Sequence, residues 1–403
     1  MKLLIEVFLL LMLLAVLYTY LGYGLLIYLI VKLRKLMGRK RSIPNNSSFI
    51  PEVMLVVPAY NERDCIDEKV NNSLALDYPP DKLHILFVTE GSTDGTTELV
   101  EQYATTNPRV HVMGGRQRLG KIEAVNRAMH QIKAPYVIFT DANTTLNSAS
   151  IKHIIRHFAD PNVGAVAGEK RIQLLSSEAA VGSGEGLYWK YESFLKRLDT
   201  ELYSVVGAAG ELFAVRTELY EQVEKDTLLD DFVISLRIAE RGYRVVYEPD
   251  AYALERPSFS VGDEKKRKVR IAAGGFQAIS RLQPLLNIFR YGWLSFQYTS
   301  HRVMRWAVAP FCLPLIVILN GLLLALPGNG LLSDTVYQGL FVAQLGFYSA
   351  ALLGYYLEDR QIRVKMLFVP YYFSFMNGCA LLGYVRYRRG NDNGIWEKVR
   401  RAA

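Results

Sequence analysis

The chain of 403 residues is 50% hydrophobic, carries a formal net charge of +8 and contains three cysteines. Because Cys65, Cys312 and Cys379 stand far apart, they indicate neither a disulfide framework nor a zinc site, and they suit a reducing, cytoplasmic compartment. The basic residues gather beside apolar stretches. This distribution is typical of contact with anionic membrane lipids and argues against nucleic acid as a partner.

Residues 3–33 contain almost no charge after Glu6, and this run exceeds the roughly 20 residues that a membrane span needs. A basic stretch follows without a small-residue cleavage site, so we expect an uncleaved anchor rather than a signal peptide. Further apolar stretches near 307–327, 336–357 and 366–385 predict later spans. The predicted order is a transmembrane anchor 1–33, a basic juxtamembrane linker 34–52, a large α/β domain 53–257, an amphipathic interfacial or gating segment 258–306, about three transmembrane helices within 307–386 and a basic tail 387–403.

The charges leave one conflict in the membrane topology. The basic residues after the first span place residues 34–300 on the cytoplasmic side. Three later spans would then leave the tail outside, although it contains Arg386, Arg388 and Arg389. Either one apolar stretch is re-entrant or interfacial, or the charge rule fails in this chain.

The central part of the chain alternates short apolar runs with helical patterns. Residues 54–57, 84–89 and 136–140 predict buried parallel strands. Residues 62–76, 96–103 and 121–132 predict helices between and before them. This order is that of a nucleotide-binding α/β half, in which ligands bind at the carboxyl edge of the sheet.

Polar side chains follow the predicted strands at that edge. Asn61 and Glu62 come after the first strand and Glu90 and Asp94 after the second, where they can bind a base or a ribose. Asn61 and Asp94 equally suit helix caps. Lys121 opens a helix, where a lysine either holds phosphate beside the helix dipole or lies in solvent.

The triplet Asp141-Ala142-Asn143 follows the third predicted strand. Two oxygen-bearing side chains at this spacing can share a hard cation and, through it, a diphosphate. The triplet alone is also typical of a turn.

Several motifs stand in a fixed order along this part of the chain: VVPAYNE, EGSTDGT, GKIEAVNRAM and TDAN, then GAAGELFAVR and LDDF. Taken together, over roughly residues 53–275, they resemble the inverting family 2 glycosyltransferases with a GT-A fold. The resemblance implies an α/β GT-A nucleotide-sugar-binding domain with a mixed, mainly parallel sheet and helices on both faces. Transmembrane α-helices would flank this domain.

The resemblance also implies a role for each matching residue on the donor side. Ala59, Glu62, Glu90 and Asp94 would surround the nucleotide base and ribose. Lys121 would approach the diphosphate of the nucleotide sugar.

The metal and the chemistry would belong to other matching residues. Asp141 and Asn143 stand at the family's DxD motif, so they would bind Mg²⁺ or Mn²⁺. Asp231 would be the general base that takes a proton from the attacking sugar hydroxyl. Because Asp231 opens a predicted helix, a structural carboxylate at the helix start remains the alternative. On the acceptor side the resemblance places Gly210, Glu211 and Asp230.

Three positions depart from the family pattern. Glu90 stands where Asp is usual, and Asn143 replaces the second acid of DxD. Processive members carry QxxRW beside the membrane, whereas the corresponding stretch here, RKVRI, lacks the tryptophan that would stack on the acceptor sugar. Arg267 and Arg270 in this stretch either contact diphosphate or form a basic patch at the membrane surface.

The expected protein is a multi-pass enzyme of the cell membrane with its catalytic domain in the cytoplasm. It would move a sugar from a nucleotide sugar, UDP-linked, to a glycan or lipid-linked acceptor in cell-surface polysaccharide or glycolipid synthesis. Membrane lipids and export or accessory subunits are the further expected partners. The alternative is a catalytically inactive nucleotide-sugar-binding subunit of a synthase or export complex. Asn143 and Glu90 favour this alternative, whereas Asp141 and Asp231 oppose it. A transporter is disfavoured because the later spans lack ionisable residues.

Overall fold

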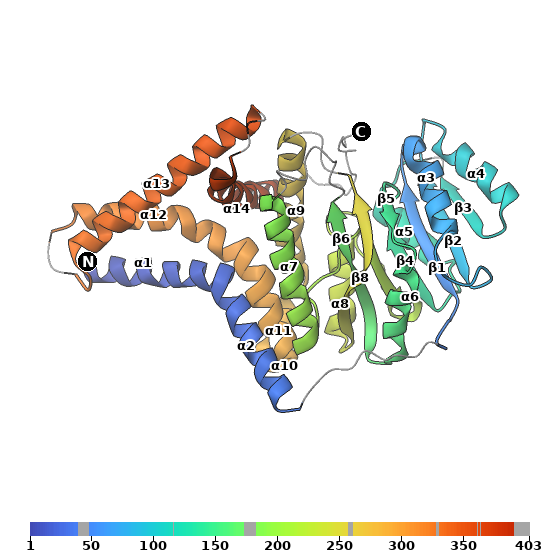
Figure 1. Ribbon diagram of the computed structural model, residues 1–403, viewed down its shortest axis with the longest axis horizontal. Coiled ribbons are helices and arrows are strands. Elements are labelled where there is room, and N and C mark those ends of the chain that lie inside the picture. Colours follow the sequence, from blue (N-terminus) through green and yellow to red (C-terminus); the bar gives the residue numbers. More distant parts are fainter. Residues whose placement is uncertain are drawn as a thin grey trace.

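A sheet domain and a group of long apolar helices extending away from it make up the structure (Figure 1). It is a computed structural model that describes residues 1–38, 48–115, 117–172, 183–256, 261–327, 330–360, 362 and 364–390. The predicted basic tail from 391 onward lies outside the described residues.

An eight-stranded mixed sheet with the strand order β3-β2-β1-β4-β7-β6-β8-β5 forms the centre of the domain. Its strands are β1 (Val53–Ala59), β2 (Leu83–Glu90), β3 (Val110–Gly115), β4 (Tyr136–Thr140), β5 (Thr144–Leu146), β6 (Val163–Ile172), β7 (Leu212–Arg216) and β8 (Arg244–Glu255). Parallel pairing joins β3, β2, β1 and β4, whereas β7 runs antiparallel to both β4 and β6. The predicted fold class is therefore confirmed, and β3 is a strand that the sequence patterns did not indicate.

Helices cover both faces of the sheet (Figure 1). They are α3 (Arg63–Leu74), α4 (Thr96–Thr106), α5 (Lys121–Met129), α6 (Ser150–Ile155), α7 (Ser183–Leu202) and α8 (Asp230–Glu240), with short turns η2 (Arg156–Ala159) and η3 (Thr217–Leu219). The parallel strands β1, β2 and β4 all end at one edge of the sheet, as expected from their register. The polar loops that follow these strands therefore lie together.

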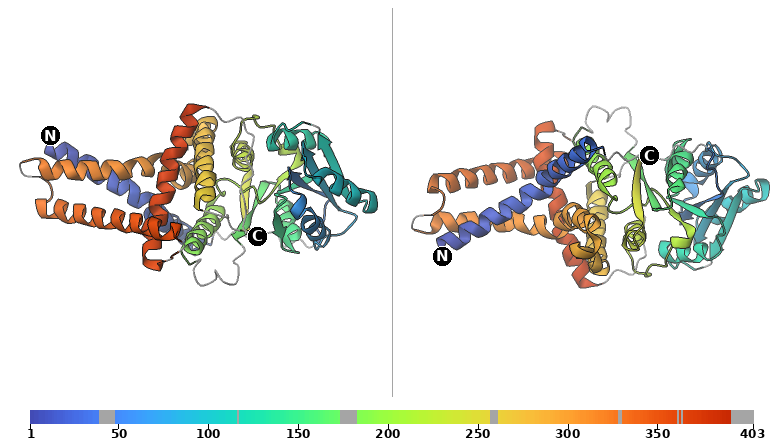
Figure 2. Two further views of the ribbon diagram at one scale, coloured as in Figure 1. Left: turned by 90° about the horizontal axis from the view of Figure 1, so that it is seen from above. Right: turned by 90° about the horizontal axis from the view of Figure 1, so that it is seen from below.

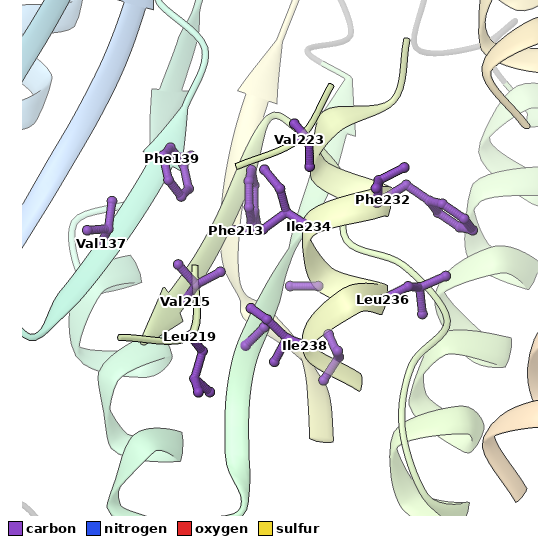
Figure 3. Packing of buried hydrophobic residues seen from close by; sticks show 14 of the residues in the cluster. Val137, Phe139, Phe213, Val215, Leu219, Val223, Phe232, Ile234, Leu236 and Ile238 are labelled. Atoms are coloured by element: carbon purple, nitrogen blue, oxygen red, sulfur yellow. The ribbon is translucent and has the colours of Figure 1, made fainter. Parts of the chain in front are cut away.

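The strands alternate between two apolar layers. Val137 and Phe139 of β4 belong to the layer under α8, and Ile138 belongs to the layer on the opposite face. Figure 3 shows Phe139 and Phe213 of neighbouring strands beside Ile234 of α8. The two rings stack with centroids 4.7 Å apart. Burial of each such side chain stabilises the fold by roughly 1.5–3 kcal/mol, so these layers hold the edge loops in place.

Four stretches are long and apolar enough to cross a membrane, judged by length and composition: Lys2–Leu36, Trp293–Ala325, Asp334–Glu358 and Met366–Arg389. The first comprises α1 (Lys2–Leu17), the π-helical turn η1 (Tyr18–Gly22) and α2 (Tyr23–Leu36). The others comprise α11 (Trp293–Tyr298), the π-helical turn η5 (Thr299–Val308) and α12 (Ala309–Ala325), then α13 (Asp334–Asp359) and α14 (Lys365–Arg389). The second stretch begins at Trp293 rather than near 307, because α11, η5 and α12 continue as one helix.

Between the domain and these stretches lie α9 (Val261–Arg281), η4 (Gln283–Leu286) and α10 (Ile288–Tyr291). Figure 2 shows that α1, α12 and α13 extend side by side, whereas α14 lies across them next to α9. Phe276 of α9 packs against Tyr384 and Tyr387 of α14, with ring centroids 5.1 and 6.3 Å apart. Helix α14 is therefore packed along the boundary between the domain and the other apolar helices.

Candidate active site

One large cavity lies between the carboxyl edge of the sheet and the helices α7, α9, η5 and α14. Its volume of about 880 Å³ is within the roughly 300–1,000 Å³ typical of small-molecule sites. We call the part formed by the loops after β1, β2 and β4 the loop end, and the part formed by η1, α7 and α14 the helix end. The predicted site residues in its wall are Ala59, Glu62, Glu90, Lys121, Asp141, Asn143, Gly210, Glu211, Asp230, Asp231, Arg267 and Arg270.

Glu90 is a buried carboxylate at the loop end of the cavity. It pairs with Arg127 at 2.7 Å and accepts a hydrogen bond from the backbone amide of Leu119 at 3.3 Å. Burial raises the pKa of Glu90 above its usual value, and the charge of Arg127 offsets part of this increase. Ala59 and Glu62 line the same end of the cavity. The contacts of these residues with a base or ribose stay predictions.

Asn61 and Asp94 lie beside the cavity and hold its loops together. The side-chain oxygen of Asn61 accepts a hydrogen bond from the amide of Thr93 at 2.8 Å. Asp94 accepts hydrogen bonds from the amides of Thr96 at 3.0 Å and Arg63 at 3.2 Å, and so supports the starts of α4 and α3. Neither residue is the N-cap of the following helix, since Glu62 and Gly95 occupy those positions, and both side chains instead bind the loops. Their predicted nucleotide contacts stay predictions.

Lys121 connects the carboxylates in the middle of the cavity. Gly120, with a φ of 103°, lets the chain turn so that Lys121 opens α5. The Lys121 amine donates to Asp141 Oδ1 at 2.9 Å and lies 3.9 Å from Asp230 Oδ2. Burial alone would lower the pKa of Lys121, but Asp141 and Asp230 outweigh it and raise the pKa above its usual value. The amine is therefore a permanent positive charge at a helix N-terminus, where phosphate groups also bind well.

Asp141 and Asn143 line the same stretch of the cavity after β4. One carboxylate and one amide oxygen leave the remaining ligand positions of Mg²⁺ or Mn²⁺ to phosphate oxygens and water. In the described part of the chain, no group of three or more His, Cys, Asp or Glu side chains can hold a metal ion. The residues present therefore fit a cation that arrives with a diphosphate, rather than one caged by the protein alone.

Asp231 lies at the start of α8, next to Asp230, as predicted. A Cβ atom on Gly210 would be 3.4 Å from the Asp231 carboxylate and 3.7 Å from the Lys121 amine, so these groups share one small space. Burial and the charge of Asp230 together raise the pKa of Asp231 to about 7, although Lys121 opposes the increase. A carboxyl group with a pKa near neutral pH is suited to general-base catalysis.

Glu211 belongs to an ion-pair network that anchors the loop before β7. Lys170 of β6 pairs with both Glu211 and Glu255. Burial alone would raise the pKa of Glu211, but Lys170 outweighs it and lowers the pKa to about 2. Glu211 is therefore a permanently charged anchor rather than a base.

The two arginines predicted as site residues in α9, Arg267 and Arg270, have different surroundings. Arg267 donates to both carboxylate oxygens of Glu264, at 3.0 and 2.9 Å, and also lies 4.0 Å from Glu255 of β8, so its guanidinium is surrounded by acids. Arg270 lines the cavity, where burial lowers its pKa below the usual value. Both arginines line the cavity, and their contacts with a diphosphate stay predictions.

The tryptophan missing from α9 has a counterpart on another helix. Ile271 occupies the expected position, but Trp306 of η5 lines the same cavity. Its ring packs on Gly275 of α9, where a Cβ atom would be only 2.6 Å away, and lies 5.2 Å from the ring of Phe232. The motif tryptophan is therefore absent from α9 as predicted, while Trp306 of another helix lines the same cavity. The sequence did not indicate that η5 folds against α9.

Sequence patterns also missed a buried charge network at the helix end. Glu192 of α7 pairs with Arg302 at 2.9 Å and with Arg305 at 2.7 Å. Burial alone would raise the pKa of Glu192, but these arginines hold it well below its usual value. The signal that could have found this wall is the spacing of the two arginines within one helical turn, directly before a tryptophan.

The sequence patterns also did not indicate two further residues at the loop end of the cavity, Tyr60 and Arg118. Both line the cavity, and the guanidinium of Arg118 lies 3.9 Å from the centre of the Tyr60 ring. The pair forms an aromatic and cationic wall of a kind that suits a nucleotide base and phosphates.

Comparison with known proteins places the chain in a family. The model described as glycosyltransferase like family 2 matches residues 51–277, more than half of the chain, so the protein belongs to this family. Poly-β-1,6-N-acetyl-D-glucosamine synthase from Staphylococcus aureus is 29% identical over 259 residues, which are 63% of this chain and 61% of that protein. The Staphylococcus epidermidis protein of the same name is 25% identical over 266 residues, 64% of this chain and 62% of its own length. The match thus spans less than two thirds of these curated relatives.

A solved structure shares the fold. The mannosyltransferase from Pyrobaculum calidifontis, in complex with GDP-Man and Mn²⁺, is 23% identical and superposes with a TM-score of 0.71. The likeness covers 96% of this chain and 99% of that chain, so it includes the apolar helices as well as the sheet domain.

Proposed function

We propose that this protein is a membrane-bound inverting glycosyltransferase that moves a sugar from a nucleotide sugar to a hydroxyl group of a glycan or lipid-linked acceptor. Its products would belong to cell-surface polysaccharide or glycolipid synthesis, in line with the names of its relatives. One observation carries the proposal: the carboxylate of Asp231 lies in the same cavity as the Lys121–Asp141 pair. A base and a diphosphate site held side by side are what a sugar transfer requires.

The donor, UDP-linked in this proposal, would lie at the loop end of the cavity. Glu62 and Glu90 would bind the base and ribose, and Lys121 would bind the diphosphate. Asp141 and Asn143 would hold Mg²⁺ or Mn²⁺, which neutralises charge on the leaving diphosphate. The Mn²⁺ named for the mannosyltransferase of the same fold supports a divalent cation.

Asp231 would take the proton of the acceptor hydroxyl while its oxygen attacks the anomeric carbon from the side opposite the diphosphate. The bond between the anomeric carbon and the diphosphate breaks as the new bond forms, so the configuration of that carbon inverts. Lys121 stays beside the departing diphosphate and balances its charge. Gly210 leaves the space in which the acceptor oxygen reaches Asp231.

For the membrane we propose that α14 is interfacial and that α1, α12 and α13 cross. Helix α14 lies across the other three (Figure 2), and Arg386 near its end is close enough to Arg270 for their charges to interact. With three crossings, α13 returns the chain to the side of the domain. The basic end of α14 then lies on the same side as Arg34 and Lys35 after the first span, as the positive-inside rule requires. This arrangement removes the topology conflict and keeps the domain in the cytoplasm. Export or accessory subunits stay a prediction.

The test is release of nucleoside diphosphate by the purified protein from a panel of UDP- and GDP-sugars, with Mn²⁺, Mg²⁺ or a chelator. We expect cation-dependent release from one donor, and a loss of at least about tenfold in Asp141→Ala, because the cation then lacks its carboxylate. Asp77→Ala is the matched control, since Asp77 is an exposed acid paired with Lys152. If the wild type releases no more than Asp141→Ala from every donor, the protein is the inactive nucleotide-sugar-binding subunit instead.

A further inference from the structure

The cavity continues past the carboxylates into the apolar helices. Between η1 and α14 most of its lining residues are apolar or aromatic. We call this part the apolar arm and define it by its lining residues, Tyr20, Leu21, Phe368, Val369, Phe373 and Met376.

The apolar arm has an exposed mouth. Leu21 and Val369 line the cavity, yet their side chains are 64% and 57% exposed, so they stand at its mouth. Both belong to stretches with the length and composition of membrane spans. With α1 crossing the membrane and α14 at its interface, as proposed above, this mouth faces lipid.

The roof of the apolar arm is a contact between η1 and α14. The rings of Tyr20 and Phe373 lie with centroids 4.8 Å apart, and the Tyr20 hydroxyl donates to Asn377 Oδ1 at 2.6 Å. The hydroxyl of Tyr372 and the amide of Asn377 are the polar groups of α14 here, and the other residues that define the arm are apolar or aromatic. Hydrocarbon gains by burial against such a surface, whereas sugar hydroxyls would lose hydrogen bonds to water.

The tyrosines and glycines of α13 do not line a passage for a polymer. Tyr355 and Tyr356 of α13 are about half exposed on the surface rather than in the cavity wall. A Cβ atom on Gly339 or Gly346 would meet no atom within 4 Å, so these glycines face open space. In the described part of the chain, α13 contributes nothing to the cavity wall.

We propose that the apolar arm holds the hydrocarbon chain of a lipid-linked acceptor, whose headgroup hydroxyl reaches Asp231. This inference rests on the proposed function and adds the acceptor class to it. The nucleophile is a hydroxyl rather than a lipid phosphate, because only a proton-bearing nucleophile needs a base. Arg302 and Arg305 also line the cavity, but both already pair with Glu192. Their charges are thus engaged by a carboxylate, which agrees with a hydroxyl rather than a phosphate as the nucleophile.

The test compares dodecyl and methyl glycosides of the same sugars as acceptors, with the full chain in lipid nanodiscs and the donor identified above. We expect the wild type to show a KM for the dodecyl glycoside at least about tenfold lower than for the methyl glycoside. Val369→Trp and Leu21→Trp narrow the mouth from opposite walls, and each should remove this preference. Leu382→Trp is the matched control, because Leu382 is an exposed residue of α14 outside the cavity wall, and it should keep the preference.

Two results would overturn the proposal while leaving the sugar-transfer reaction intact. One is an equal KM for dodecyl and methyl glycosides in the wild type. The other is preferred, repeated extension of a water-soluble oligosaccharide, which would make the arm a glycan passage. Absence of donor turnover under every condition would instead remove the proposed function, and the acceptor class with it.

Discussion

The amine of Lys121 lies 2.9 Å from Asp141 Oδ1, where the predicted cation and diphosphate would also bind. A lysine amine donates equally well to a carboxylate and to a phosphate oxygen. The Lys121 amine can therefore pair with Asp141 before the donor binds and donate to a diphosphate oxygen afterwards. This relationship joins two sequence motifs, GK and DAN, that lie twenty positions apart.

Replacing Lys121 with methionine should weaken donor binding. The change removes the positive charge beside the diphosphate, so we expect the KM for the nucleotide sugar to rise by about tenfold or more. Lys121→Arg keeps the charge and should retain more of the affinity. Donor kinetics and the Kd of the product nucleotide measure both effects. Equal donor affinity in Lys121→Met and the wild type would place the diphosphate elsewhere.

The rate of transfer should depend on pH through Asp231. Because the pKa of this carboxyl is raised to about 7, it is protonated and inactive as a base in acid. We expect kcat/KM to fall by about tenfold per pH unit below the pKa and to level off above it. A profile that stays flat between pH 5 and 8 at saturating cation, for example, would exclude a base with this pKa.

The stability of the folded protein should also depend on the ionisation of Asp231. It should fall as the pH rises, whereas the rate of transfer should increase. Folding raises the pKa of Asp231 from 3.8 to about 7, so the folded state binds a proton more tightly than the unfolded state does. Stability from this group is therefore fully present below the lower value and is lost as pH rises through the upper one. Asp231→Asn removes this penalty, so its Tm at pH 8 should equal or exceed that of the wild type. A lower Tm would mean that the Asp231 carboxylate stabilises the fold.

Trp306 should act on the acceptor rather than on the donor. Trp306→Ala removes a ring from the cavity wall and should raise the acceptor KM, while the donor KM changes little. A pair of aromatic rings such as Trp306 and Phe232 contributes about 0.5–1.5 kcal/mol beyond burial. Trp306→Phe keeps an aromatic ring at this position, so it should retain part of the acceptor affinity. An increase confined to the donor KM would assign Trp306 to the nucleotide instead.

The side of the membrane on which α14 ends can be measured directly. In a cysteine-free background, Ser333→Cys reports the loop before α13 and Arg389→Cys reports the exposed end of α14. We expect a membrane-impermeant maleimide to label Ser333→Cys on intact cells, and Arg389→Cys only after the cells are opened. Labelling of both on intact cells would mean that α14 crosses the membrane.

Much of the loop end was predictable from sequence, because local patterns determine it. Short apolar runs predicted β1, β2 and β4, and polar residues after parallel strands necessarily meet at one edge. The pair of acids at the start of α8 was likewise visible in the sequence.

The helix end was not predictable, because it depends on contacts between distant parts of the chain. Glu192 meets Arg302 and Arg305 across two helices, and Tyr20 meets Phe373 from opposite ends of the sequence. Trp306 could replace the missing α9 tryptophan only because Gly275 leaves room for its ring. Edge strand β3 was missed because its residues are only partly buried, which weakens the apolar pattern.

The central claim is that Asp231 is the base of a sugar transfer, and its most direct test is kcat in Asp231→Asn with saturating donor and acceptor. Asparagine keeps the shape of the side chain but cannot take a proton, so we expect kcat to fall by about 100-fold or more. Asp230→Asn is the comparison, because Asp230 is the buried neighbour that lies 3.9 Å from the Lys121 amine, and it should retain more activity. A folded Asp231→Asn variant that transfers sugar at the wild-type rate would contradict the claim.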